Sequence, residues 1–171
     1  MAGDEKNFER IFWPHLRGAY NLARWLTKND HDAEDVVQES FTRAFQRRDT
    51  FRGGDARVWL LAIVRNTTMS YLRRRQSSAE SPWSPEVKDP VDASLTAEQA
   101  LIEKSRTDQL RTAIAALPAD YREVIVLREL EGLAYKEISA VLNVPLGTVM
   151  SRLSRAREQL LRALAPEGVR D

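Results

Sequence analysis

Apolar residues recur at intervals of three and four along most of this chain, the spacing that places side chains on one face of an α-helix. The first stripe lies between residues 7 and 26, and a second follows Asp32. We expect Asp32 to cap that second helix, with Asp35 in its first turn near the positive end of the helix dipole. The apolar run 58–64 continues in helical register to Arg75, so we interpret it as helix and not as strand.

Two breaks interrupt this pattern. Gly53 and Gly54 lie side by side in the segment 51–55, and paired glycines predict a loop. A longer break covers residues 77–95, where three prolines, an acidic bias and no periodicity indicate a linker. Immediately afterwards, Thr96 and Gln99 match a capping box that starts a new helix.

The second half of the chain is helical in pattern again. Its first helix closes at Pro118, the next ends at Gly132, and two short helices follow at 134–141 and 147–163. In the helix that closes at Pro118, we assign these apolar positions to the core: Leu101, Ile102, Leu110, Ile114 and Leu117. The prediction is therefore an all-α protein of two small helical domains joined by a flexible acidic linker: 7–76, the linker 77–96, and 97–165.

The last two helices form the strongest motif. Both have apolar residues at inward spacing, and they meet at a turn containing Asn143, which is the helix-turn-helix pattern. The outward face of the second helix carries side chains that can reach base edges and phosphates: Thr148, Ser151, Arg152, Ser154, Arg155 and Arg157. The alternative is an ordinary helical hairpin with a basic solvent face. The coincidence of turn, inward spacing and basic outward face favours DNA binding.

Composition excludes several classes of function. The 171 residues include no cysteine, so disulfides, thiolate zinc sites and iron–sulfur clusters are excluded, and two histidines cannot make a zinc site by themselves. We expect no metal, no cofactor and no catalytic residue, because no Ser-His-Asp set or phosphate-cradling glycine motif is present. The longest apolar run has seven residues, too few to cross a bilayer, and the start lacks a signal peptide pattern, so we expect a cytoplasmic protein without membrane insertion.

Charge is nearly balanced overall but segregated along the chain. The net charge is +1, yet residues 1–76 carry +4, 77–108 carry −4 and 109–171 carry +1. Residues 30–39 hold five acids and no Lys or Arg, whereas 56–76 hold five arginines and no acid. Such runs are often solvated helix faces. They also suit a protein that meets a polyanion on one face and a basic partner on another.

Several segments resemble bacterial extracytoplasmic-function (ECF) sigma factors, group 4 of the sigma-70 family of RNA polymerase subunits. Residues 117–124, 131–138 and 144–157 resemble their region 4. Residues 32–41 resemble the part of region 2 that binds polymerase, and 59–66 the promoter-reading segment. The resemblance extends over about residues 8–165, almost the whole chain. It implies a non-catalytic subunit that directs promoter-specific transcription initiation in an envelope or environmental stress response.

The resemblance also implies partners and site residues. Core RNA polymerase would be bound through a coiled coil of its largest catalytic subunit and through its flap region, with contacts from Asp32, Asp35, Gln38 and Glu39. The minus-10 element would meet Arg52, Gly53, Arg57, Trp59, Arg65 and Asn66. The minus-35 element would meet Tyr135, Lys136, Thr148, Ser151, Arg152, Ser154, Arg155 and Arg157. A cognate anti-sigma factor is expected as a further partner, and acts as the external sensor for a chain without thiols.

Some alternatives stay open at this stage. Trp59 is either a base-stacking residue or a core residue packed against Val36 and Phe41. The acids of the second helix either dock on polymerase or only stabilise the helix start. Ala134 stands where the family would have a capping Ser or Thr, so we expect a weaker start for that helix. A dimeric helix-turn-helix regulator with a ligand-sensing first domain is the competing function, although no polar-anchored pocket is evident in the sequence.

Overall fold

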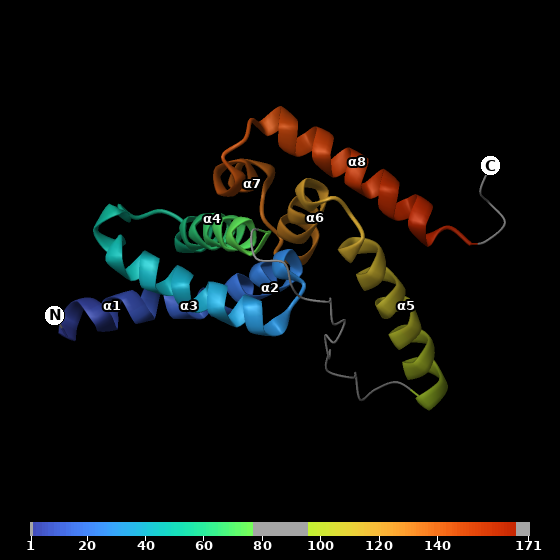
Figure 1. The fold of residues 1–171 in the computed structure, drawn as a ribbon, viewed down its shortest axis with the longest axis horizontal. Coiled ribbons are helices and arrows are strands. Elements are labelled where there is room, and N and C mark those ends of the chain that lie inside the picture. Colours follow the sequence, from blue (N-terminus) through green and yellow to red (C-terminus); the bar gives the residue numbers. More distant parts are fainter. Residues whose placement is uncertain (1, 77–95, 167–171) are drawn as a thin grey trace.

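The computed structural model describes residues 2–76 and 96–166, and both described parts are helical with no strand. The first part, here the first module, contains four α-helices and two short 3₁₀ turns (Figure 1): α1 (Ala2–Phe12), η1 (Trp13–His15), α2 (Leu16–Thr27), α3 (Asp30–Gln46), η2 (Arg48–Thr50) and α4 (Ala56–Gln76). The second module contains α5 (Ala97–Ala115), α6 (Ala119–Ile125), the π-helical turn η3 (Val126–Leu130), α7 (Tyr135–Leu142) and α8 (Leu146–Leu164). The all-α prediction is confirmed. The predicted linker lies outside the described residues, except for Thr96.

The start of the chain departs from the single apolar stripe seen in the sequence. Pro14 lies in the 3₁₀ turn η1, so α1 and α2 are separate helices. Proline has no N–H to donate to the preceding turn, and its ring clashes with the carbonyl four residues earlier. Apolar residues on both sides of the break, such as Phe12 and Leu22, still belong to one core.

The prediction that Asp32 caps the second helix is wrong. The cap is Asn29, whose Oδ1 accepts the backbone N–H of Asp32 at 2.9 Å. Asp32 is therefore the third residue of α3 and is itself buried. Asn and Asp cap helices about equally well, so the residue type alone does not separate Asn29 from Asp32, three residues later.

α5 begins with the predicted capping box, but three of the five residues that were predicted to lie in the core are exposed. Thr96 Oγ1 accepts from the Gln99 N–H and the Gln99 carboxamide accepts from the Thr96 N–H, which completes the capping box. Ile114 and Leu117 are buried, whereas the expected core residues nearer the helix start are exposed: Leu101 at 70%, Ile102 at 46% and Leu110 at 41%. Only the C-terminal end of α5 packs on the rest of the second module, against α6 and α8.

The corner between α5 and α6 is held by a buried arginine. Arg122 donates through Nη1 to the carbonyls of Ala115 and Leu117, at 3.0 and 3.2 Å. These carbonyls lie at the C-terminal end of α5, where a positive charge also interacts favourably with the negative end of the helix dipole. After α6 and η3, Gly132 has φ +68°, a left-handed conformation that ends the helix as the sequence indicated.

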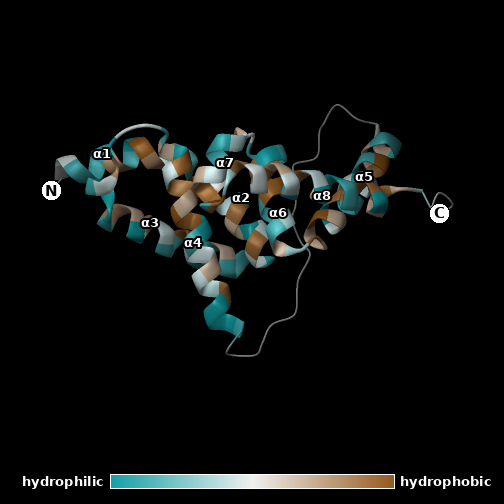
Figure 2. Ribbon diagram, turned by 90° about the horizontal axis from the view of Figure 1, so that it is seen from above, coloured by the Kyte–Doolittle hydropathy of each residue, from teal (hydrophilic) through white to brown (hydrophobic). Residues whose placement is uncertain are grey.

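The buried side chains of both modules form one continuous hydrophobic cluster. Within the first module, α2, α3 and α4 pack on one another; between the modules, α4 lies along α7 and α2 lies against α6 (Figure 1). The last turn of α4, with its three consecutive arginines, points away from this core and is drawn as hydrophilic in Figure 2. The sequence left the relative placement of the modules open, and the structure joins them through α4.

Candidate nucleic-acid and partner interfaces

The acidic helix α3 presents only part of its charge to solvent. Asp35 and Gln38 are exposed and share one face, since they are three residues apart. Glu39 lies on the same side but is bound within the chain, to Arg43 at 2.5 Å and to Arg74 of α4 at 3.1 Å. Asp32 has a different setting: it is buried, accepts the Tyr71 hydroxyl at 2.9 Å and pairs with Arg75.

Tyr71 has a structural role that the sequence did not indicate, because its hydroxyl donates to Asp32. Their hydrogen bond ties α4 to the first turn of α3. Burial of the phenol, together with this hydrogen bond and the nearby negative charge, raises the pKa of Tyr71. The predicted polymerase-binding helix is thereby fixed relative to the predicted promoter-reading helix.

The loop before α4 has the geometry that the paired glycines predicted. Gly53 and Gly54 have φ of +87° and +93°, and nothing lies within 4 Å of the place where a side chain would begin at either position. The backbone of this loop is therefore open to close approach. Asp55 then caps α4, accepting the N–H groups of Arg57 at 2.9 Å and Val58 at 3.3 Å. Arg52 and Asn66 are both exposed.

Trp59 lies in an aromatic cluster at the base of this loop. Its ring centroid is 5.1 Å from that of Phe12 and 5.4 Å from that of Phe51. Trp59 also packs against the hydrophobic core, and its ring contacts join that core to α1 and to the loop. Trp59 is half-buried, and its ring supports the loop through Phe51.

Two arginines nearer the start of α4 face the second module. Arg57 donates through Nη1 to the backbone carbonyl of Glu131 at 2.9 Å. Arg65 forms a two-pronged ion pair with Glu123 of α6, Nε to Oε2 at 3.1 Å and Nη2 to Oε1 at 3.3 Å. The Glu123 side chain is 1% exposed and that of Arg65 is 23% exposed. Burial raises the pKa of Glu123, and the Arg65 hydrogen bonds and charge oppose that rise.

The helix-turn-helix is formed by α7, a left-handed Asn143 at φ +52°, and α8. Ala134 supplies no side-chain cap to α7, as expected. Instead the Glu137 carboxylate accepts the Ala134 N–H at 2.7 Å, so one half of a capping box is retained. The inward residues of both helices are buried: Ile138, Val141, Leu142, Val149, Leu153 and Ala156.

The three arginines in the middle of α8 differ in their surroundings. Arg152 is largely buried between Asp120 and Glu123, at 3.7 Å from each. Arg157 is held by Glu129 at 2.7 Å. Arg155 is exposed and has no ion-pair or hydrogen-bond partner among residues 2–76 and 96–166. Arg155, which lies between the other two in sequence, is therefore the arginine that directs its charge to solvent.

The rest of the predicted minus-35 set is distributed over the same face. Ser151 and Ser154 are exposed, and Thr148 is half-buried near the start of α8. On α7, Lys136 is exposed, while the Tyr135 ring is half-buried beneath Arg128, whose guanidinium carbon is 5.0 Å from the ring centroid. Hydroxyls beside an exposed guanidinium suit phosphate and base-edge contacts.

Known proteins with similar sequences define the family. The family model described as "Sigma-70 region 2" matches residues 11–78, and the family model described as "Sigma-70, region 4" matches residues 107–160. The ECF RNA polymerase sigma-E factor of Salmonella typhimurium strain LT2 is 37% identical, over 97% of this chain and 91% of that protein. The chain belongs to the ECF RNA polymerase sigma factors.

Two further relatives extend this result. The ECF RNA polymerase sigma factor SigE of Mycolicibacterium smegmatis is 37% identical over 93% of this chain, but the chain spans only 62% of that protein's length. The solved sigma factor RpoE of Bartonella quintana, in complex with the anti-sigma factor NepR, is 28% identical with a TM-score of 0.76, over 95% of this chain and 99% of that one. Sigma factors are non-catalytic subunits of RNA polymerase, so this chain is not an enzyme.

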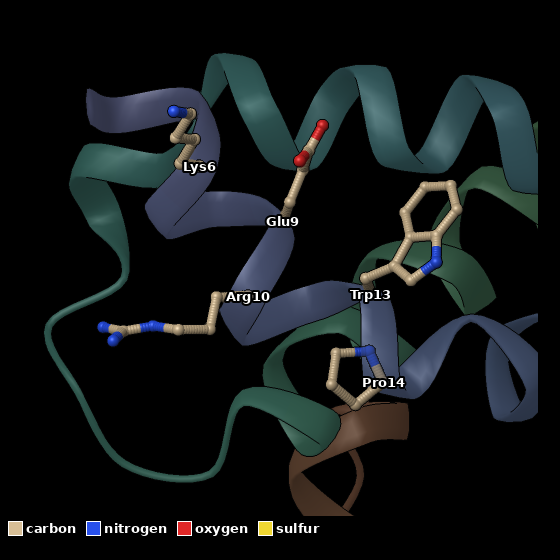
Figure 3. A pocket seen from close by; sticks show the side chains of 5 residues that line it. All are labelled: Lys6, Glu9, Arg10, Trp13 and Pro14. Carbon is tan, nitrogen blue, oxygen red and sulfur yellow. The ribbon is translucent and has the colours of Figure 1, made fainter. Parts of the chain in front are cut away.

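Other features of the sigma factor do not suggest a ligand site. An open hollow of about 510 Å³ lies beside α1 and η1 (Figure 3), lined by Lys6, Glu9, Arg10, Trp13 and Pro14. None of the residues that line it belongs to the predicted site. The described ranges contain no cluster of three potential metal ligands. In the same ranges, no helix is long and apolar enough to span a membrane.

Sequence reasoning missed two residues that organise these interfaces. Glu123 and Glu131 lie in the region 4 module and bind arginines of the region 2 module. Glu123 lies within the segment 117–124 that resembles region 4. Its neighbours Asp120 and Arg122 are charged as well, so the local sequence does not mark Glu123 as buried, and its burial depends on packing against α4.

Proposed function

We propose that this sigma factor binds core RNA polymerase and directs it to promoters, with the first module reading the minus-10 element and the second the minus-35 element. The observation that carries the proposal is that one chain combines two kinds of surface, one acidic and one suited to DNA. An exposed acidic face on α3 is joined to a helix-turn-helix whose second helix presents hydroxyls and an exposed arginine, Arg155. The functional modules are proposed at 7–76 and 97–165.

Core polymerase docking is assigned to α3. Asp35 and Gln38 are proposed as direct contacts, because both side chains are exposed on one face. Glu39 borders that face and exchanges its bonds with Arg43 and Arg74 for a basic partner surface. Asp32, which the sequence grouped with these residues, is proposed to act by positioning α3 from within, since it is buried. The partner surfaces are the coiled coil of the largest subunit and, for the second module, the flap region.

Minus-10 recognition is assigned to the loop and to α4. Open backbone at Gly53 and the half-buried Trp59 ring suit an unstacked base of single-stranded DNA. Arg52 and Asn66 are exposed and suit backbone and base-edge contacts. Arg57 and Arg65 of α4 are proposed as further contacts with the minus-10 element.

Minus-35 recognition is assigned to α8 in a major groove, with α7 against the backbone. Ser151, Ser154 and Arg155 are proposed as the central contacts, with Thr148, Arg152 and Arg157 beside them. Tyr135 and Lys136, at the start of α7, are proposed as phosphate contacts.

Regulation by an anti-sigma factor is proposed on the basis of the Bartonella quintana relative, which was solved with one. Release from that partner would serve an envelope or environmental stress response. The site of action is the cytoplasm, where bacterial polymerase and DNA are found.

Run-off transcription tests the proposal directly. The purified chain is added to bacterial core polymerase with a library of genomic promoter fragments. Discrete start sites that require the chain are expected, and their alignment gives both promoter elements. Tight binding to a palindrome without polymerase, and no stimulation of transcription, would instead identify a dimeric regulator.

A charge reversal separates docking from promoter reading. Asp35→Arg should weaken the affinity for core polymerase at least tenfold and leave unfolding unchanged. Glu9→Arg, an equal charge change at an exposed position of α1, is the matched control and should bind normally. Equal losses in both variants would exclude the α3 face as the docking surface.

A further inference from the structure

The exposed face of α8 carries an apolar side chain among its polar ones. Met150 is 51% exposed. It lies one residue before Ser151 and four residues before Ser154, so it shares the face of these two proposed minus-35 contacts. The apolar residues on either side of this face, Val149 and Leu153, are buried and hold α8 against the rest of the second module. Met150 is therefore not part of the core that holds the helix in place.

A second exposed apolar residue lies beside Met150. Leu146, the first residue of α8, is 39% exposed and precedes Met150 by four residues, so the two side chains are neighbours on the helix surface. Gly147 adds no side chain next to them, and nothing lies within 4 Å of a Cβ built there. The first turns of α8 thus present an apolar patch, here defined as Leu146 and Met150, that a partner can approach closely.

The place of this patch favours DNA as its partner. In a helix-turn-helix, the residues near the start of the second helix contact base edges in the major groove. The apolar group that base edges carry in that groove is the C5 methyl group of thymine. Methionine suits such a group, because its unbranched and polarizable side chain adapts to the shape of its contact. The patch therefore complements a methyl group on the floor of the groove.

We propose that Met150, supported by Leu146, contacts the C5 methyl group of a thymine in the minus-35 element and so specifies an A·T pair at that position. The inference rests on the proposed function, since α8 must enter the major groove. Ser151, Ser154 and Arg155 supply hydrogen-bond donors on the same face, whereas Met150 supplies an apolar contact. The two kinds of contact read different features of neighbouring base pairs.

Removal of the methyl group from the DNA tests this contact without any change in the protein. Run-off transcription first identifies the minus-35 element. Each thymine on either strand is then replaced singly by deoxyuridine, which pairs like thymidine but lacks the methyl group. Affinity of the holoenzyme is measured at one fixed salt concentration, because binding to DNA depends strongly on salt. One of the replacements should weaken binding by wild type about fourfold, the effect expected for one lost methyl contact.

Variants connect this loss to Met150. Met150→Ala should bind the natural promoter more weakly, and the sensitive deoxyuridine replacement should then have no further effect, because the two changes remove the same contact. Met150→Leu keeps an apolar side chain and should retain sensitivity to the methyl group. Leu161→Ala is the matched control: Leu161 is 73% exposed on α8 but lies about three turns further along the helix, so this variant should show the full loss. Melting temperatures should be unchanged, since both positions are exposed.

Several results would overturn the proposal. They are a wild type that tolerates every deoxyuridine replacement, a minus-35 element without an A·T pair, and a deoxyuridine effect that persists in Met150→Ala. Weaker binding of Met150→Ala to core polymerase, with promoter discrimination unchanged, would assign the patch to a protein partner instead. Failure of the proposed function has a separate signature, since wild type then gives no chain-dependent start site. Failure of this inference alone leaves the start sites and the sensitivity to whole base-pair exchanges intact.

Discussion

The three central arginines of α8 offer a prediction that sequence alone could not make. Their spacing presents them as equivalent, but Arg152 is three-quarters buried between two carboxylates, whereas Arg155 is exposed without a partner in the described part of the chain. We expect Arg155→Ala to weaken promoter binding without changing stability. We expect Arg152→Ala to lower stability first, and to weaken binding through the loss of folded helix-turn-helix.

The magnitudes follow from these contacts. Breaking a well-formed buried pair costs about 3–5 kcal/mol. The contacts of Arg152 are long, at 3.7 Å, and Glu123 keeps its closer partner Arg65. The loss for Arg152→Ala should therefore be lower, about 1–2 kcal/mol, which for a chain of this size shifts the melting temperature by ~2–8 °C. For Arg155, a bidentate base contact contributes about 1–3 kcal/mol of discrimination, or roughly 5- to 150-fold in affinity.

The assay combines thermal unfolding with promoter binding by the holoenzyme. Arg155→Lys keeps the charge and loses the guanidinium fork, so it should retain affinity if Arg155 contacts only phosphate, and lose it if Arg155 reads a base. Binding measured on promoters with altered minus-35 elements separates the same alternatives. The reasoning is refuted if Arg155→Ala lowers the melting temperature as much as Arg152→Ala, or if Arg155→Ala binds like wild type.

Three further variants test the local structure. Asp55→Ala should lower the free energy of unfolding by about 1 kcal/mol at neutral pH through loss of the α4 cap, with Asp55→Asn nearly unchanged. Burial raises the pKa of Asp55, but the backbone hydrogen bonds from Val58 and Arg57 and the charge of Arg57 oppose this effect, and the net pKa is lowered from its ordinary value of 3.8. The resulting stabilisation is present above pH 3.8 and is lost as pH falls through the folded-state pKa, so urea titrations should show the difference between wild type and Asp55→Ala closing in acid. Arg122→Leu should destabilise by about 2–4 kcal/mol in urea, because two buried carbonyls at the end of α5 lose their donor. Gly132→Ala should cost about 1 kcal/mol from backbone strain alone, since nothing lies within 4 Å of the added Cβ, and a neutral result would show that φ +68° is not required there.

The amino-acid pattern was sufficient for the elements that depend on a few neighbouring residues. The capping box of Thr96 and Gln99, the loop at Gly53 and Gly54 and the turn of the helix-turn-helix were all predicted. In each case the deciding hydrogen bond or backbone angle involves residues within about one helical turn. The prediction of Asp32 as helix cap failed, because Asn29 is equally suitable as a capping side chain and takes this position.

The partners of the charged residues required the tertiary structure. Arg65 and Glu123 are 58 residues apart in sequence, and periodicity places each on a helix face without indicating that the faces meet. The exposure of Leu101 had the same origin, since helical spacing marks an apolar side but not whether another helix covers it. Local hydrogen bonding and side-chain period determined the helices and the family motifs of this protein. Packing between distant segments decided which arginines remain exposed, because ion pairing and burial depend on contacts that chain order does not specify.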